Sequence, residues 1–390
     1  MKAPAVWLLG LLPLLAFEQK TQIAAGYNFY DPYGNEAVTF GRSELAFENG
    51  YFRTNAAVEY LYSGEYADRR YVLLNELYVS KDIGDYRFVL GKKIEFWGET
   101  EGFSFADIYN HRNYLYDPFD KDAKYGSVGA SVSRFFDEDT LTLGLKLYEA
   151  DIPYPEAGEP YHPFPFDYDA GAHFSLSRYS PSVYLSYEHV FSGAVDAQTR
   201  LILWHGYDNK RIFLPVGPDT LAQYAYRCGK AMLLADAVYE DYIFKTEMTY
   251  TDVIDEPRVS DYAQFSFGLE RSFHDIAGTD VTLYGEYYHY HYADGGKTEN
   301  VDIAELYDND VFGAVRIAFN DTGDSSLKAG VLADVKNGER FYRAEASGRL
   351  FERFVARAEY LCLTAARSDA TPMTYIGDTR RFGLSVAYTF

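Results

Sequence analysis

The sequence predicts an all-β fold, a transmembrane, antiparallel, up-and-down β-barrel of about 18 strands, with 16 as the next best count. Three observations favour it. Segments of roughly ten residues alternate between apolar and polar side chains, short turns alternate with long loops, and aromatic residues form 18% of the 390 residues and gather at segment ends. Matched alternating strands with short turns at one rim and long loops at the other are typical of transmembrane β-barrels.

The alternation is clearest in residues 141–148, where four leucines share one face. Because successive strand side chains point to opposite faces, such a segment turns one face to lipid and the other to water. A soluble β-sandwich also alternates, but it has no need of aromatic residues at strand ends, which fit girdles at the two membrane interfaces. The pattern starts with a strand at 22–31 and recurs at 183–188, 263–270 and 311–319.

Short turns and long loops separate these predicted strands. The in–out alternation breaks between residues 179 and 221, so either two segments there form one strand or 210–215 contains a further one. The turn-like stretches are 48–50, 82–85, 137–139, 321–324 and 336–339, and the long loops are 98–125, 150–168, 294–309 and 366–379.

The first residues predict an export signal. Lys2 precedes an apolar run from Ala5 to Phe17, and polarity returns at Glu18. The run is too short to cross a bilayer as a helix but matches the apolar region of a signal peptide. We therefore expect a signal peptide over 1–16, with cleavage after Ala16 as the best site, and a single barrel domain over 17–390. A buried helix start is the alternative interpretation.

Composition excludes several classes of protein. With 58 acidic and 36 basic residues the formal charge is −22, and nucleic-acid binding needs clustered Lys and Arg instead. The two cysteines, Cys228 and Cys362, form no zinc or disulfide framework. One disulfide between them stays open, although two independent thiols are the preferred interpretation. No cofactor and no nucleic-acid partner are predicted.

The last strand carries the most specific pattern. Its outer face bears apolar and aromatic side chains, and Phe390 closes the sequence. This segment resembles the terminal strand of Gram-negative outer-membrane barrels. The resemblance implies an assembly signal read by the barrel-assembly machinery, an outer-membrane location, and contact with outer-membrane lipids and lipopolysaccharide. The residues of this signal are Phe382, Leu384, Val386, Tyr388 and Phe390.

A second segment, 91–99, reads Gly-Lys-Lys-Ile-Glu-Phe-Trp-Gly-Glu and is followed by Asp-Ile-Tyr-Asn at 107–110. It resembles the G-[RK]-[QK]-x-x-x-W-G-E strand end of certain uncharacterised outer-membrane porin-like proteins. Because the solute of that family is not settled, this resemblance supports the architecture alone.

No catalytic site is predicted, and we do not expect an enzyme. His173 and Ser175 share a face that we place on the lumen side, but no third residue is evident that would orient them as base and nucleophile. His289 and His291 also share a face, yet no Cys or carboxylate joins them at a recognised metal-ligand spacing. They fit an interfacial girdle better, and no nucleophile-elbow, zincin or P-loop motif is present.

The function predicted is an outer-membrane porin, a water-filled channel for passive passage of small solutes or ions. Charge on the lipid face costs roughly 2–4 kcal/mol per Arg or Lys at the midplane, so charged strand positions must face a wet lumen. The alternatives are a substrate-specific transporter for small organic compounds and a non-conducting structural or adhesive barrel. A homotrimer is compatible with a porin, although nothing in the sequence marks an interface. The predicted pore wall comprises Arg87, Lys93, Glu95, Arg316, Lys328, Arg343 and Arg357.

The loop 98–125 is the candidate constriction. It is rich in both aromatic residues and carboxylates, and an ordinary surface loop has little reason to be so aromatic. We expect it to fold into the lumen opposite the basic wall strands and to give a weak cation preference. The alternative is a capping surface loop. If the loop folds inward, the residues predicted to face the pore are Glu99, Glu101, Asp107, Asp117, Asp120 and Asp122.

Overall fold

The computed structural model describes residues 17–49, 51–254, 256–293, 307–365 and 372–390. The predicted signal peptide, 1–16, therefore lies outside the described residues, as does most of the predicted loop 294–309. The structural statements below concern the described residues.

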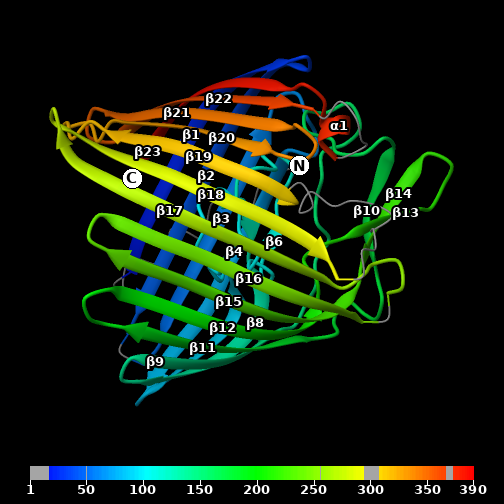
Figure 1. The fold of residues 1–390 in the computed structure, drawn as a ribbon. Helices are drawn as coiled ribbons and strands as arrows, with labels where there is room; N and C mark the ends of the chain where they lie inside the picture. Colours follow the sequence, from blue (N-terminus) through cyan, green and yellow to red (C-terminus); the bar gives the residue numbers. More distant parts are fainter. Residues whose placement is uncertain (1–16, 50, 255, 294–306, 366–371) are drawn as a thin grey trace.

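The described chain forms one closed 18-stranded antiparallel barrel (Figure 1), which confirms the predicted fold class and strand count. Each wall strand pairs with its neighbours along the chain, and β1 pairs with β23 to close the wall. The wall strands are β1 (Phe17–Asp31), β2 (Gly34–Glu48), β3 (Arg53–Ser63), β4 (Arg70–Ile83), β5 (Tyr86–Lys93), β8 (Ser127–Phe136), β9 (Asp139–Lys146), β11 (Ser182–Phe191), β12 (Asp196–Tyr207), β15 (Arg227–Tyr239), β16 (Tyr242–Ile254), β17 (Tyr262–Ile276), β18 (Thr279–Tyr292), β19 (Asn309–Ala318), β20 (Ser326–Asp334), β21 (Arg340–Leu350), β22 (Phe354–Thr364) and β23 (Arg380–Thr389).

Two parts of the expected strand order need correction. The first strand starts at Phe17, five residues before the expected start at 22, because Phe17 already pairs with Phe47 of β2. The segment 210–215 does contain a strand, β13 (Ile212–Pro215), but it lies outside the wall. A strand that does not cross the wall explains why the in–out alternation failed there.

The wall shows the two faces that the sequence predicts. On β9, Leu141, Leu143 and Leu145 point outward and are 39%, 50% and 37% exposed, whereas Lys146 on the opposite face is 2% exposed. On β23 the outward residues Phe382 and Leu384 are likewise exposed. Large exposed apolar side chains on alternating strand positions suit a hydrocarbon surrounding, so polar residues are left to the interior.

The two rims differ in their connections. At the short-turn rim, hairpins such as β4–β5 and β17–β18 are closed by tight turns in which Gly84 and Gly278 adopt positive φ, a conformation that glycine tolerates without strain. At the long-loop rim, the connections include 94–126, 147–181, 208–226 and 365–379. Because the strands of the wall alternate in direction, almost all of the long connections gather at one end.

Short strands and one helix lie at the long-loop rim. Strands β10 (Asp167–Phe174), β14 (Thr220–Ala225) and β13 form a three-stranded sheet (Figure 1, right). Strands β6 (His111–Arg112) and β7 (Lys124–Tyr125) pair within the connection 94–126, and α1 (Pro372–Ile376) precedes β23. In the described part of the chain no helix has the length and apolar character needed to cross a bilayer. His173 lies on β10, which corrects its expected place in the barrel lumen.

Candidate functional site in the barrel interior

The connection 94–126, called the inner loop below, lies against the inner face of the wall. Most of its residues are buried, and Ala106 and Ile108 are fully shielded from solvent. Its Trp97 ring packs edge-on against Tyr184 of β11 and Trp204 of β12, with ring centroids 5.0 Å and 6.1 Å away. These aromatic contacts hold the start of the loop to one side of the barrel.

A single wall carboxylate organises the turn of the inner loop. Glu247 of β16 is fully buried. Its Oε1 accepts the backbone N–H groups of Glu99 at 2.7 Å and Thr100 at 3.2 Å, and its Oε2 accepts that of Phe105 at 2.8 Å. The N–H of Ala106 and the hydroxyls of Thr100 and Ser104 also donate to it. Hydrogen bonds to a charged acceptor are about twice as strong as neutral ones, so this carboxylate is the main anchor of the turn.

A second anchor follows on β18. The carboxylate of Glu286 accepts the N–H groups of Glu101 at 2.6 Å and Gly102 at 2.8 Å, and the Tyr288 hydroxyl accepts the N–H of Phe103 at 2.9 Å. Both wall side chains are buried. The backbone donors of the inner loop turn are therefore met by acids projecting from two strands of the wall.

The far end of the inner loop is fixed by an ion-pair network on β21, β22 and β23. The Asp117 carboxylate lies 2.6 Å from the Arg343 guanidinium and 3.1 Å from that of Arg381. Both arginines also contact Glu359, at 2.7 Å and 2.5 Å. Two acids and two bases thus alternate across the gap between loop and wall, and Arg381 is 1% exposed within it.

A third contact joins the loop to β20. The Lys328 ammonium contacts the Glu101 carboxylate, which also lies 3.4 Å from the Lys121 ammonium. Lys121 donates in addition to the Thr100 carbonyl at 3.1 Å. The basic wall strands and the acidic loop therefore meet at Lys328 and Arg343.

A cavity of about 390 Å³ lies between the inner loop and this charged wall. Its lining includes six carboxylates and five cationic side chains. Most of these are paired with one another, but the Asp122 carboxylate is exposed. The charged lining residues are Glu101, Asp117, Asp120, Asp122, Glu345 and Glu359, with Lys121, Lys328, Arg343, Arg357 and Arg381.

The other residues predicted for the pore, apart from Arg357, do not line this cavity. Asp107 is 2% exposed and pairs with Lys124 at 2.7 Å within the loop, so it departs from the expected pore-facing position. Glu99 is half-buried beside the Glu247 anchor. Arg357 pairs with Glu345 of the neighbouring strand at 3.2 Å and makes no ion pair with the inner loop. Arg316 lies beside Tyr284 on the inner wall face.

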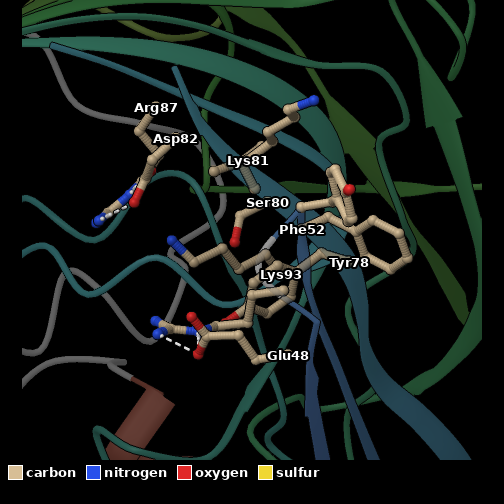
Figure 2. Close-up of a pocket in the computed structure, with 11 residues that line it drawn as sticks. Glu48, Phe52, Tyr78, Ser80, Lys81, Asp82, Arg87 and Lys93 are labelled. Carbon is tan, nitrogen blue, oxygen red and sulfur yellow. Dashed lines mark hydrogen bonds and ion pairs between the residues drawn. The ribbon is translucent and has the colours of Figure 1, made fainter. Parts of the chain in front are cut away.

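Arg87, Lys93 and Glu95 lie nearer the short-turn rim. Figure 2 shows a cavity of about 210 Å³ there, in which Arg87 faces Asp82 at 2.8 Å. Lys93 points into the same cavity and pairs with Glu95 at 2.9 Å. The Arg87–Asp82 pair is largely open to solvent, and such pairs contribute little to stability.

Two groups of side chains, a histidine pair and an aspartate cluster, consist of residue types that can bind metal ions. His289 and His291 stack with ring centroids 6.4 Å apart on β18, on the face opposite the buried Tyr288. At the long-loop rim, Asp308, Asp310 and Asp334 place carboxylate oxygens within 4.8 Å of one another. Oxygen ligands of this kind suit a hard cation such as Ca²⁺, but Lys336 already lies 2.7 Å from Asp308 and balances part of the charge.

Neither of the two anchors, Glu247 and Glu286, is among the pore residues that the sequence predicts. A glutamate at an inward position of an alternating strand is the signal that marks both. Inward position alone does not distinguish an acid exposed to water from one that caps loop N–H groups. That distinction depends on where the inner loop lies.

Solved outer-membrane proteins share this fold, although no protein-family model and no curated sequence matches the chain. OccK2 (OpdF) of Pseudomonas aeruginosa superposes with a TM-score of 0.59 at 11% identity, covering 96% of this chain and 97% of that one. OccK11 (OpdR) of the same organism gives 0.57 at 10% identity, covering 96% of both. The outer membrane protein OpdK gives 0.53 at 11% identity, covering 96% and 99%.

At these identities the likeness concerns the fold. The chain shares the barrel fold of these outer-membrane proteins. It matches these barrels over nearly its whole length and theirs.

Proposed function

We propose that this protein is a passive channel of the outer membrane of a Gram-negative bacterium, through which small solutes or ions pass. The observation that carries the proposal is the cavity between the inner loop and the β20–β23 wall, where fixed charges of opposite sign face one another. Charged side chains opposed across a narrow passage select solutes by charge and dipole. A barrel of 16–18 strands also leaves enough interior for an aqueous path.

The charge of the lining supports a weak cation preference. Its carboxylates outnumber its cations by one. The arginines and Lys328 are engaged in ion pairs with the loop or with neighbouring strands. Asp122 stays exposed, so the charge free to attract an ion in the passage is negative.

A specific channel is a closer description than a wide, general pore. The inner loop is held by a buried carboxylate at one end and by an ion-pair network at the other. A constriction fixed in this way presents the same geometry to each solute, which favours discrimination over unselective passage. This observation supports the alternative of a substrate-specific transporter for small organic compounds.

Planar-bilayer recording of the refolded full chain across a KCl gradient tests the proposal. Discrete conductance steps are expected, with a reversal potential displaced toward the K⁺ equilibrium value. Protein that is folded but silent in the bilayer would instead indicate a non-conducting structural barrel. Steps with a reversal potential on the Cl⁻ side would retain the channel and remove the cation preference.

A further inference from the structure

A third cavity, of about 540 Å³, lies at the long-loop rim and is separate in its lining from the constriction. It is bounded by the connection 147–181, by the β6–β7 part of the inner loop and by the β3–β4 connection, 64–69. Its volume falls in the range of small-molecule sites, roughly 300–1,000 Å³.

The first unusual feature of this cavity is a pair of neighbouring acids with unpartnered carboxylate oxygens. Asp68 lines the cavity, and neither of its carboxylate oxygens is exposed or hydrogen-bonded in the described structure. Glu159 lies beside it, is 8% exposed, and leaves Oε2 equally unpartnered. Two carboxylates cannot hydrogen-bond to each other unless one holds a proton, and a buried charge without a partner is costly. The pair therefore calls for a proton or another cation.

The second feature is the aromatic wall around these acids. Tyr125, Tyr154 and Tyr168 all line the cavity. Tyr168 lies within electrostatic range of both Asp68 and Glu159. Its hydroxyl accepts the N–H of Tyr154 at 3.0 Å, which fixes its ring. Ring faces carry negative charge density and attract organic cations, most strongly where water is excluded.

The charges of the cavity wall favour a cationic ligand over an anionic one. Three carboxylates line it, those of Asp68, Asp151 and Glu156. Burial lowers the pKa of His111 to about 4, so this residue is neutral at pH 7. Lys92, at the opposite side, donates its ammonium hydrogen to the Leu74 carbonyl at 2.8 Å. Arg69 faces Glu159 but is ion-paired with Glu36 at 3.3 Å. The acids beside the tyrosine rings therefore carry more negative charge than the neighbouring cations balance.

We propose that this cavity binds an organic ammonium ion, with the carboxylates of Asp68 and Glu159 balancing its charge and the tyrosine rings contacting its alkyl or aryl groups. The site is distinct from the constriction and needs no ion flow for its occupancy. Binding can therefore be measured whether or not the barrel conducts.

Binding should rise with pH. Burial and the neighbouring Asp68 raise the pKa of Glu159 to about 8. The other titratable groups that face Glu159 are Tyr66, Arg69, Glu156 and Tyr168. Below pH 8 a proton occupies the acid pair and competes with the ligand, and above pH 8 the pair is fully ionised. A permanently charged ammonium should thus bind up to roughly thirtyfold more tightly at pH 9 than at pH 6.5.

The experiment is calorimetric titration of the folded full chain in neutral detergent with benzyltrimethylammonium chloride, with benzyl alcohol as the uncharged comparison. Asp68→Asn should weaken binding by roughly ten- to hundredfold, since a charged contact is lost. Glu159→Gln should remove the pH dependence. The matched control is Glu65→Gln, which deletes an exposed carboxylate of the same connection that does not line the cavity. It should bind like the unmodified chain.

Three results would overturn the proposal. They are no binding of the ammonium at millimolar concentration, equal binding of benzyl alcohol, or equal losses in Asp68→Asn and Glu65→Gln. A titration with CaCl₂ gives a fourth such result. If calcium binds in a way that depends on Asp68 and the ammonium does not bind, the acid pair is a site for an inorganic cation. Unchanged gel mobility of the unboiled variants shows that each still folds. Loss of ammonium binding with conductance intact would reject this site and leave the channel proposal standing.

Discussion

Asp117 has two roles, of which the sequence predicts only one. As a loop carboxylate it was expected to face the pore, and it does line the cavity. It also bridges Arg343 and Arg381, the second of which is almost fully buried. Removing Asp117 would leave Arg381 with one carboxylate partner fewer in a buried site, which is costly. A variant of Asp117 therefore changes both the attachment of the inner loop and the charge of the cavity. Other residues are needed to test ion selectivity alone.

Asp120 and Asp122 supply that cleaner probe. They line the same cavity and have no ion pair with the wall in the described structure. Asp120→Asn combined with Asp122→Asn should shift the reversal potential toward Cl⁻, because two negative charges leave the passage while the loop anchors stay intact. Arg343→Ala combined with Arg357→Ala should shift it the opposite way. Bilayer recording in a KCl gradient measures both, and unchanged selectivity in both variants would place the ion path away from this cavity.

The inner loop is the element on which the channel proposal depends. Its turn is held largely by Glu247, which accepts six hydrogen bonds from loop groups. Few alternative acceptors exist once this carboxylate is removed, and each buried N–H left unpaired costs about 1–3 kcal/mol. The loop should then detach from the wall far more readily than the wall strands separate.

Glu247→Ala should therefore give larger and noisier conductance steps than the unmodified protein, since a loosened loop no longer narrows the passage. Glu44→Ala is the matched control, because Glu44 is an acid of the wall strand β2 that pairs with Arg42 at 2.5 Å and does not touch the loop. Single-channel recording compares the two variants. Equal, unaltered steps in both would mean that the inner loop does not limit conduction.

The barrel wall of the described chain is closed, because β1 pairs with β23 over ten residue positions. A closed antiparallel wall has no unpaired strand at which unfolding can begin. Unboiled protein in detergent should therefore migrate differently from boiled protein on a denaturing gel. Identical mobility, or solubility of the folded chain without detergent, would contradict a membrane barrel.

Assembly of that wall is expected to depend on its last strand. The outward side chains Phe382, Leu384 and Val386 are exposed, as is the terminal Phe390. Deleting Phe390 should lower the yield of heat-modifiable barrel in the outer membrane and leave export unchanged, if the closing aromatic is read by the assembly machinery. The ratio of folded to exported protein measures this, with Phe319→Ala, an exposed wall-end aromatic elsewhere, as the control.

The alternation of apolar and polar residues was enough to predict the barrel wall. Side chains alternate across a strand with a period of two, and lipid accepts only apolar groups on one side, so Leu141, Leu143 and Leu145 were bound to face outward. The same pattern placed Glu247 inward, and the aromatic content of 98–125 marked that loop as unlike a surface loop. These inferences needed only local spacing.

The contacts inside the barrel could not be predicted from the same pattern. Glu247 and Phe105 lie 142 positions apart, and Arg343 and Asp117 lie 226 apart, and no periodicity specifies such pairings. The segment 210–215 was a candidate wall strand because a short apolar run has the same residue pattern in a barrel wall and in a rim sheet. Likewise, Asp68 and Glu159 come together from two separate connections. A repeating pattern fixes which face a residue occupies, whereas its partners depend on how the loops fold across the barrel.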